Sequence, residues 1–242
     1  MRWLLAPRWI VAHIVVLILV VVFVSLGLWQ LRRLEERRLT NTVSQARFEE
    51  DAVDIAGLLD ASGEDVDSLE HRRATATGTF QPEHEVLIRS QVEQGVAGFH
   101  VITPLVGEWG AILVNRGWVP LGLDEVPVDE ALPPEGEVTI EGWVRPTQIR
   151  GALGPLDPPQ GRLIAMNRVD IERIEQQVPW DLAPVYLVLL GEQVDGQPIL
   201  VPAPVLDDEG PHLAYAIQWF SFALVGIVGY AMLIRRSSRR SA

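Results

Sequence analysis

Histidine is the residue type in this chain best suited to bind a metal or move a proton, and it occurs five times. The positions are His13, His71, His84, His100 and His212. No two of them lie four residues apart, the spacing at which two imidazoles on one helix face share a metal ion. Cysteine is absent and methionine occurs only three times, so the soft sulfur ligands that copper prefers are scarce. The histidines therefore indicate neither a paired metal site nor a copper-delivering protein.

Nucleophilic and acid–base chemistry has no clearer signal. The chain lacks a Gly-x-Ser-x-Gly turn, the motif that exposes a nucleophilic serine. Acidic residues number 32 against 20 basic ones, but no spacing pairs two carboxylates across a cleft. We interpret them as solvated surface residues. A net charge of −12 also argues against binding to nucleic acid.

The residues that follow His212 carry more information. His212 precedes an uncharged apolar segment, 213–234, whose first turns contain Tyr215, Gln218 and Trp219. On a helical wheel of about 100° per residue these side chains share one face. The same face holds three further residues, Phe222, Gly226 and Gly229. Because an amide inside an apolar helix needs a hydrogen-bond partner, we expect this face to meet a partner helix.

Two other interpretations of these side chains stay open. In one, Trp29, Tyr215 and Trp219 form an aromatic belt that anchors helices among lipid head groups. In the other, His212 only extends its ring to the membrane interface. The chemical alternative is that a neutral His212 imidazole in a protected crevice binds haem iron. His13 cannot share that iron, because it lies roughly 20 Å away along the first apolar segment. We expect His13 either to bond to a neighbouring helix or to face lipid as a neutral ring.

Two apolar segments must position these residues. Residues 9–28 and 213–234 are each long enough to cross about 30 Å of hydrocarbon as helices. A cleaved signal peptide is the alternative for the first, because Arg2 and Arg8 precede it and small residues follow, but the apolar run exceeds the usual length. Since the first span begins at Trp9 and leaves no room for a transit peptide, we expect a bacterial plasma membrane.

The distribution of arginine predicts how the chain is oriented across the membrane. The tail 235–242 is rich in arginine and follows the second span directly, and short basic tails stay in the cytoplasm. The predicted order is a cytoplasmic N-terminus 1–8, a span 9–28, an extracytoplasmic domain 29–212, a span 213–234 and a cytoplasmic tail 235–242. Arginines 32, 33, 37 and 38 oppose this orientation, but they belong to a long loop, and long loops translocate largely regardless of charge.

The region between the spans predicts an α+β domain. After a helix leaving the membrane at 31–39 and an acidic stretch 49–70 with a short helix at 55–59 and a mobile loop, β-branched and aromatic runs alternate with Gly and Pro. The predicted strands are 74–80, 85–92, 99–106, 111–119, 138–145, 163–169, 185–190 and 198–201, with a helix at 170–177. These elements indicate an antiparallel sheet or small barrel with one or two helices. Lacking cysteine, the domain must be stable without disulfides.

Three motifs in order along the chain suggest a family. They are LGLWQLR at 26–32, VNRGWVP at 114–120 and HLAYAIQWF at 212–220, with weaker ones at 78–80, 98–105 and 140–145. Together they resemble the surfeit locus protein 1 family, the membrane assembly factors of haem-copper cytochrome c oxidase. The resemblance covers nearly the whole chain.

The resemblance implies assistance in maturing the haem-bearing subunit of the oxidase, with no enzymatic activity and with haem a transiently held at His212. Combined with the helix face, it indicates partner contacts at Gly27, Trp29, Gln30, Arg116, Gly117, Trp118, Tyr215, Gln218 and Trp219. The partners are the haem-bearing subunit or the assembled respiratory complex, together with membrane lipid. Two alternatives remain, a permanent accessory subunit of the oxidase complex and an exported membrane-anchored enzyme.

Overall fold

A computed structural model describes residues 6–63, 65–152, 154–204 and 208–240. The chain consists of two compact units. One is a helix pair formed by Met1–Val43 with Leu206–Ala242, and the other is a barrel unit formed by Ser44–Val205. This confirms the prediction of two long apolar terminal helices flanking a sheet domain.

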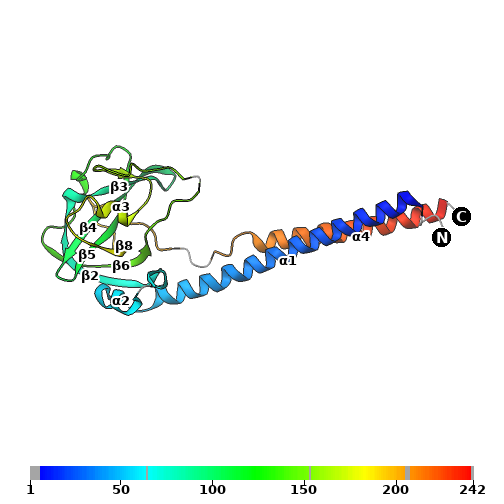
Figure 1. The fold of residues 1–242 in the computed structure, drawn as a ribbon, viewed down its shortest axis with the longest axis horizontal. Helices are drawn as coiled ribbons and strands as arrows, with labels where there is room; N and C mark the ends of the chain where they lie inside the picture. Colours follow the sequence, from blue (N-terminus) through cyan, green and yellow to red (C-terminus); the bar gives the residue numbers. More distant parts are fainter. Residues whose placement is uncertain (1–5, 64, 153, 205–207, 241–242) are drawn as a thin grey trace. The chain divides into compact units, whose positions relative to one another are not determined.

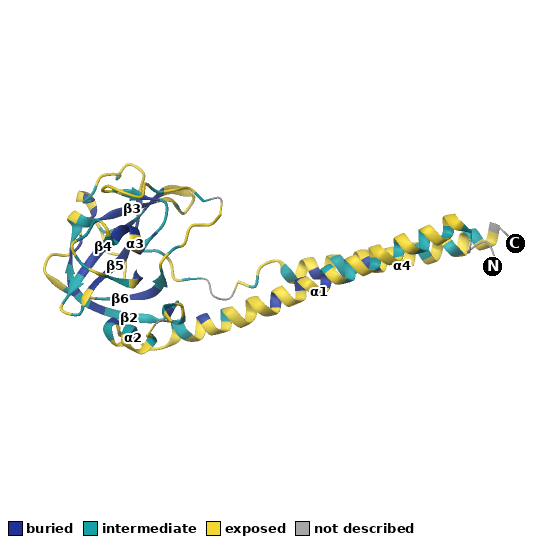
Figure 2. Cartoon of the chain, viewed as in Figure 1, coloured by how far each residue is buried: buried dark blue, intermediate teal, exposed yellow. Residues whose placement is uncertain are grey.

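The helix pair consists of the antiparallel helices α1, Pro7–Glu49, and α4, His212–Arg240 (Figure 1). Less exposed side chains recur on α1 at alternating spacings of four and three residues, at Trp9, His13, Val16, Val20, Phe23, Gly27, Gln30 and Leu34. This is the spacing that keeps one seam of a helix against a neighbour. Both helices are long and apolar enough to cross a membrane, and most of their surface is exposed (Figure 2).

His13 lies in this seam. Its Nδ1 is 2.7 Å from the hydroxyl oxygen of Tyr230 on α4, and the two rings meet edge to face. Of the two alternatives for His13, the structure therefore has the one in which it bonds to a neighbouring helix. Such a polar pair stabilises two apolar helices by roughly 0.6–2 kcal/mol.

The barrel unit contains one sheet of eight strands, five of which close into a barrel. Its eight strands have the order β1-β2-β6-β8-β5-β4-β3-β7, and an added β2–β4 pairing joins the two sides. The strands are β1 Val53–Asp54, β2 Arg73–Phe80, β3 Val86–Glu93, β4 Val96–Gly107, β5 Gly110–Pro120, β6 Glu137–Pro146, β7 Ala165–Met166 and β8 Leu182–Leu190. The closed ring β2-β6-β8-β5-β4 is antiparallel except for β5–β8. Its connectivity is that of the five-stranded Greek-key barrel found in OB-folds.

Alternation of small and large side chains explains how the barrel is filled. In β2 every second residue is buried, including Ala74, Ala76 and Phe80. These pack inside with Leu105, Ile112, Val114, Val144, Val185 and Leu187. Helix α2, Ile55–Ser62, covers this core, with Ile55 and Leu58 buried and Asp54 capping its first turn. The short helices η2 Val66–Leu69, η3 Pro82–His84 and η4 Asp129–Ala131 complete the connections.

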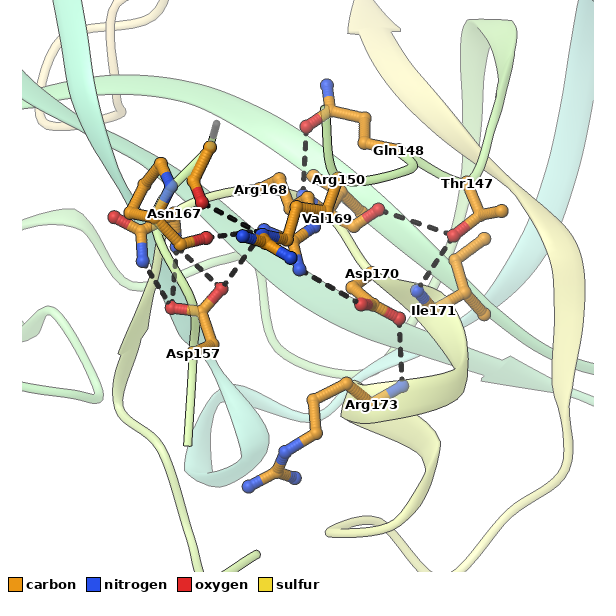
Figure 3. Close-up of polar contacts among 12 residues, drawn as sticks. Thr147, Gln148, Arg150, Asp157, Asn167, Arg168, Val169, Asp170, Ile171 and Arg173 are labelled. Atoms are coloured by element: carbon orange, nitrogen blue, oxygen red, sulfur yellow. Dashed lines mark hydrogen bonds and ion pairs between the residues drawn. The ribbon is translucent and has the colours of Figure 1, made fainter. Parts of the chain in front are cut away.

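A second core lies on the outer side of the sheet under helix α3, Ile171–Glu175. Ile171 and Ile174 pack there against Ile102, Leu113 and Tyr186 among others. The segment that precedes α3 is fastened by polar contacts around Asp157, whose carboxylate accepts hydrogen bonds from Asn167 (Figure 3). Asp170 caps α3 by accepting a hydrogen bond from the amide of Arg173, and α3 lies within the predicted helix 170–177.

Two predicted strands are wrong in extent. Residues 163–169 form only the two-residue β7, because the amide of Asn167 bonds to the side chain of Asp157 rather than to a strand. Residues 198–201 form a single bridge at Ile199, because Pro198 has no N–H and the amide of Leu200 bonds to Gln193. The stretch predicted as a mobile loop after α2 contains the helix η2, capped by Asp65.

Candidate functional site

The end of the helix pair that holds His212, here the His212 end, brings together two of the predicted site residues. Nδ1 of His212 lies 2.9 Å from Oε1 of Gln30. Gln30 is 9% exposed, so its amide is shielded by the helix seam. Because an amide oxygen only accepts hydrogen bonds, Nδ1 of His212 is the donor in this contact, and in the neutral tautomer that fits it Nε2 carries the lone pair.

His212 lines a polar hollow of about 360 Å³. Its lining consists of the cationic Arg33 and Arg37, the anionic Glu36, and Thr40, Gly210 and His212. Arg33 forms an ion pair with Glu36 at 2.8 Å. Among the described residues no hydrogen bond reaches Nε2. Gly210 borders this hollow, and its φ of +67° suits glycine. The hollow thus offers an imidazole lone pair beside two guanidinium groups.

Ion pairs fix the chain segment that enters α4 at this end. Arg38 donates two hydrogen bonds to the carboxylate of Glu209, at 2.7 and 2.8 Å. Asn41 donates to the backbone oxygen of Asp208 at 2.9 Å, and the Asp208 carboxylate accepts from the amide of Gly210. The hydrogen bond from Arg38 lowers the pKa of Glu209, and the same bond raises the pKa of Arg38. Both side chains are open to solvent, so water and salt weaken the ion pair.

Close helix packing positions the Gln30–His212 pair. Gly27 lies one turn below Gln30, and a Cβ at Gly27 would lie 2.6 Å from the ring of Phe220. Phe23 and Trp219 stack with their ring centroids 5.7 Å apart. Ala216 on α4 is almost fully buried. Small residues on one helix therefore admit large ones from the other, the usual means of close helix approach in membranes.

The structure divides the face that the sequence predicted on 212–229. His212 and Trp219 turn toward α1, whereas Tyr215, at 47% exposed, and Gln218 point away from it. Gly226 and Gly229 have open space where a Cβ would be. On α1, Trp29 is 50% exposed. The contacts of Trp29, Tyr215 and Gln218 with a partner stay predictions, while Gly27, Gln30 and Trp219 contact the chain's own helices.

Arg116, Gly117 and Trp118 lie elsewhere, inside the barrel unit. Arg116 is 2% exposed and pairs with the fully buried Glu85, with Nη2 and Oε1 2.6 Å apart. Burial lowers the pKa of Arg116, and the carboxylate of Glu85 opposes that shift. Thr103 accepts a hydrogen bond from Arg116 and donates one to Glu85. A guanidinium so enclosed is part of the domain interior rather than of its surface.

Gly117 and Trp118 fasten the segment that follows β8. The amide of Trp118 donates to the oxygen of Ile199 at 2.6 Å, and the amide of Ile199 donates back at 2.8 Å. Gly117 has a φ of +132°, and a Cβ there would overlap the Ile199 carbonyl. Arg116 adds a hydrogen bond to the side chain of Gln197. The three motif residues thus form a clasp around residues 197–199.

Comparison with known proteins assigns the helix pair and the barrel unit to one protein family. The sequence model of the SURF1 family matches residues 17–224. The chain belongs to the SURF1 family. A SURF1-like protein of Rickettsia felis is 28% identical over 232 residues, which cover 92% of this chain and 96% of the relative.

Further SURF1-like relatives cover nearly the whole chain. An uncharacterised SURF1-like protein of Mycobacterium bovis is 30% identical over 233 residues, covering 95% of this chain and 84% of the relative. A SURF1-like protein of Caenorhabditis elegans is 27% identical over 252 residues, covering 95% and 76%. The matched SURF1 range includes Gln30, His212 and the Arg116–Trp118 clasp but not His13 or Tyr230.

Several residues of the candidate site were not predicted from the sequence. Glu85 is the buried counter-ion of Arg116, and nothing in its sequence surroundings distinguishes it from the many surface acids. Glu209 and Asp208 hold the entry to α4. The sequence does contain a signal for the pairing of Gln30 with His212. Gln30 follows the first apolar segment and His212 precedes the second, so both are predicted at the same membrane face.

Proposed function

We propose that this SURF1 protein assists the assembly of haem-copper cytochrome c oxidase and that the His212 end is where it acts. The observation that carries the proposal is the Gln30–His212 hydrogen bond, in a chain whose family match includes both residues. The pair belongs to a helix seam, and His212 lines a hollow together with Arg33, Arg37 and Glu36.

The residues at the His212 end fit a transiently held haem a. Histidines that bind metals usually donate the other ring N–H to a fixed acceptor, the role that Gln30 has toward His212. Nε2 of His212 would be the iron ligand, and Arg33 and Arg37 would pair with the propionate carboxylates. The haem supplies the iron centre that the oxidase later uses. The protein's own contribution is to hold it and to release it to the partner.

The exposed stripe of α4 is the proposed contact with the haem-bearing subunit. Tyr215, Gln218, Gly226 and Gly229 remain open beside the side of α4 that packs against α1. An exposed amide within an apolar helix favours a neighbouring transmembrane helix, and glycines allow its close approach. The proposed setting is a bacterial plasma membrane crossed twice, with both termini cytoplasmic, as the arginine-rich tail favours.

A clean deletion strain tests the proposed function. Deletion should lower the amount of haem-replete oxidase several-fold, while total haem a extracted from membranes shows that haem synthesis continues. Re-expression of the wild-type chain should restore the oxidase, and a Gln218→Leu chain present at the same level should restore it only in part. Normal oxidase spectra and activity in the deletion strain would contradict the assembly function.

The permanent-subunit alternative predicts a different result. A subunit would purify with the oxidase at one copy per complex, whereas an assembly factor should be present at far lower stoichiometry. Quantitative mass spectrometry of oxidase purified at endogenous expression measures this ratio. A one-to-one ratio would contradict a transient role.

A further inference from the structure

The barrel unit contains a hollow of about 340 Å³ that the proposed function does not use. Strands β6 and β8 line one side with Val138, Ile140 and Leu189, and the segment 192–200 lines the other with Val194 and Pro198. The volume lies in the range of roughly 300–1,000 Å³ typical of small-molecule pockets. Mostly apolar walls with few polar groups are also typical of such pockets.

Arg116 lies at this hollow and keeps one donor unused. A guanidinium has five N–H groups. Nε donates to Thr103 at 2.8 Å, and Nη1 donates to the Ala131 oxygen at 2.8 Å and to Gln197 at 3.3 Å. Nη2 donates to Glu85, and its second hydrogen has no acceptor within the described ranges. A buried donor left without an acceptor is costly, so an acceptor entering the hollow gains a hydrogen bond that is ready to form.

Charge determines which acceptor fits. Arg116 is 2% exposed, and the fully buried carboxylate of Glu85 already neutralises it. A ligand carboxylate would therefore bring a second negative charge beside Glu85 in a region of low dielectric constant, which is unfavourable. The exposed rim residue Glu192 would also repel an anion. An uncharged oxygen, such as that of a ketone, ester or quinone, accepts the hydrogen bond without this cost.

We propose that the hollow binds an uncharged hydrophobic molecule through one carbonyl-type oxygen. Its apolar body lies against Val138, Ile140 and Leu189, and its oxygen accepts a hydrogen bond from Nη2 of Arg116. The proposal is independent of the function assigned to the His212 end, since every residue it uses belongs to the barrel unit.

Three probes of eleven carbons separate the contributions of shape, hydrogen bonding and charge: undecane, methyl nonyl ketone and undecanoate. Because the chain has no cysteine, Thr139→Cys gives the full-length protein a single trifluoromethyl tag at the hollow. A tag at Val92→Cys, an exposed position outside the lining, reports nonspecific effects of the detergent and probes. Fluorine NMR titrations use probe concentrations expressed per micelle.

The ketone should produce a saturable shift of the Thr139→Cys tag and bind about tenfold more tightly than undecane, as expected for one hydrogen bond to a charged donor. Undecanoate should bind most weakly. The absence of a saturable shift beyond that of the control tag would overturn the proposal. Equal affinities for ketone and undecane would contradict the proposed hydrogen bond from Arg116. Tightest binding of undecanoate would contradict the proposal that the ligand is uncharged.

A variant that fills the hollow tests the location without altering Arg116. Leu189→Trp should abolish the ketone-induced shift, whereas Leu121→Trp, at an exposed position outside the lining, should leave it unchanged. Circular dichroism and thermal unfolding establish that each variant is folded. If Leu189→Trp does not fold, Val194→Trp at the 59% exposed rim replaces it. Unchanged ketone affinity in the folded, filled variant would overturn the proposal.

Discussion

Gln30 and His212 are 182 positions apart in the chain, yet the amide oxygen of one accepts a 2.9 Å hydrogen bond from the ring of the other. The antiparallel seam of α1 and α4 brings them together, and Gly27 allows the helices to approach closely there. The bond selects the imidazole tautomer whose Nε2 can act as a ligand. Chemistry at His212 therefore depends on a residue of the other helix.

Substitution of Gln30 should change the tautomer of His212. In Gln30→Leu the fixed acceptor is lost, so the Nδ1-protonated form should give way to a mixture, and the helix pair should lose roughly 0.6–2 kcal/mol. Nitrogen-15 NMR of histidine-labelled protein in micelles measures the tautomer. Gln45→Leu, at an exposed position of the same helix, is the matched control. An unchanged His212 tautomer in Gln30→Leu would contradict the role given to Gln30.

Gly27 should tolerate no larger side chain. A Cβ at this position would lie 2.6 Å from the Phe220 ring, so Gly27→Leu should separate the helices at a cost of about 1–3 kcal/mol. Thermal unfolding in detergent measures the loss. Gly226→Leu, where nothing lies within 4 Å, should have little effect on the isolated protein. Adding Phe220→Ala to Gly27→Leu should recover part of the stability, and failure to recover any would contradict this packing.

The clasp around Ile199 should depend on Gly117. Ala at this position would be strained at φ +132° and would overlap the Ile199 carbonyl, so Gly117→Ala should cost at least about 1–3 kcal/mol. Urea unfolding measures this loss, and hydrogen exchange should show faster exchange at the amides of Trp118 and Ile199. Gly122→Ala, with open space around it, is the control. Equal stability of the two variants would show that residues 197–199 are not held in this way.

His100 should make the barrel unit sensitive to acid. Burial, with a smaller effect from Arg145, lowers its pKa from 6.5 to about 4. Between these values the unfolded chain binds a proton that the native ring does not, so the free energy of unfolding rises with pH across this interval. The penalty is complete below pH about 4 and reaches about 3 kcal/mol at most.

The test for His100 is urea unfolding between pH 4 and 7. The His100→Gln variant should show a flatter pH dependence than the wild-type chain, because an amide does not titrate in this interval. His84→Gln serves as the matched substitution on another histidine. Identical pH profiles for the wild type and His100→Gln would contradict the assignment.

The parts of the structure that follow from local pattern were predictable. Uncharged apolar runs identified both long helices, and strands such as β5, Gly110–Pro120, follow from their β-branched residues. The barrel closure was offered only as an alternative to an open sheet, because the parallel β5–β8 pairing joins strands far apart in sequence. Strand-like composition alone also overestimated residues 198–201, where a side chain of Gln193 takes the backbone hydrogen bond.

Pairings across the fold were the least predictable part of the site. Arg116 was predicted to contact a partner protein, and its ion pair with the buried Glu85 depends on the register of strands that lie apart in the sequence. Residues that the sequence assigned together to a partner surface have different roles in the structure. Gln30 and Gly27 lie in the contact between α1 and α4, whereas Gly117 belongs to the clasp around residues 197–199. Burial and partners distinguish these roles, and residue type alone does not.

The most direct test of the account is the haem a content of oxidase from a strain that carries His212→Ala at the native locus. Oxidase is purified, and haem a per oxidase protein is measured by reduced-minus-oxidised spectra, with immunoblots showing equal levels of the variant and wild-type SURF1 protein. The account predicts a several-fold fall in haem a per oxidase, with haem a still present in the membranes. A normal haem a content with normal variant levels would contradict the proposal that the His212 end serves oxidase assembly.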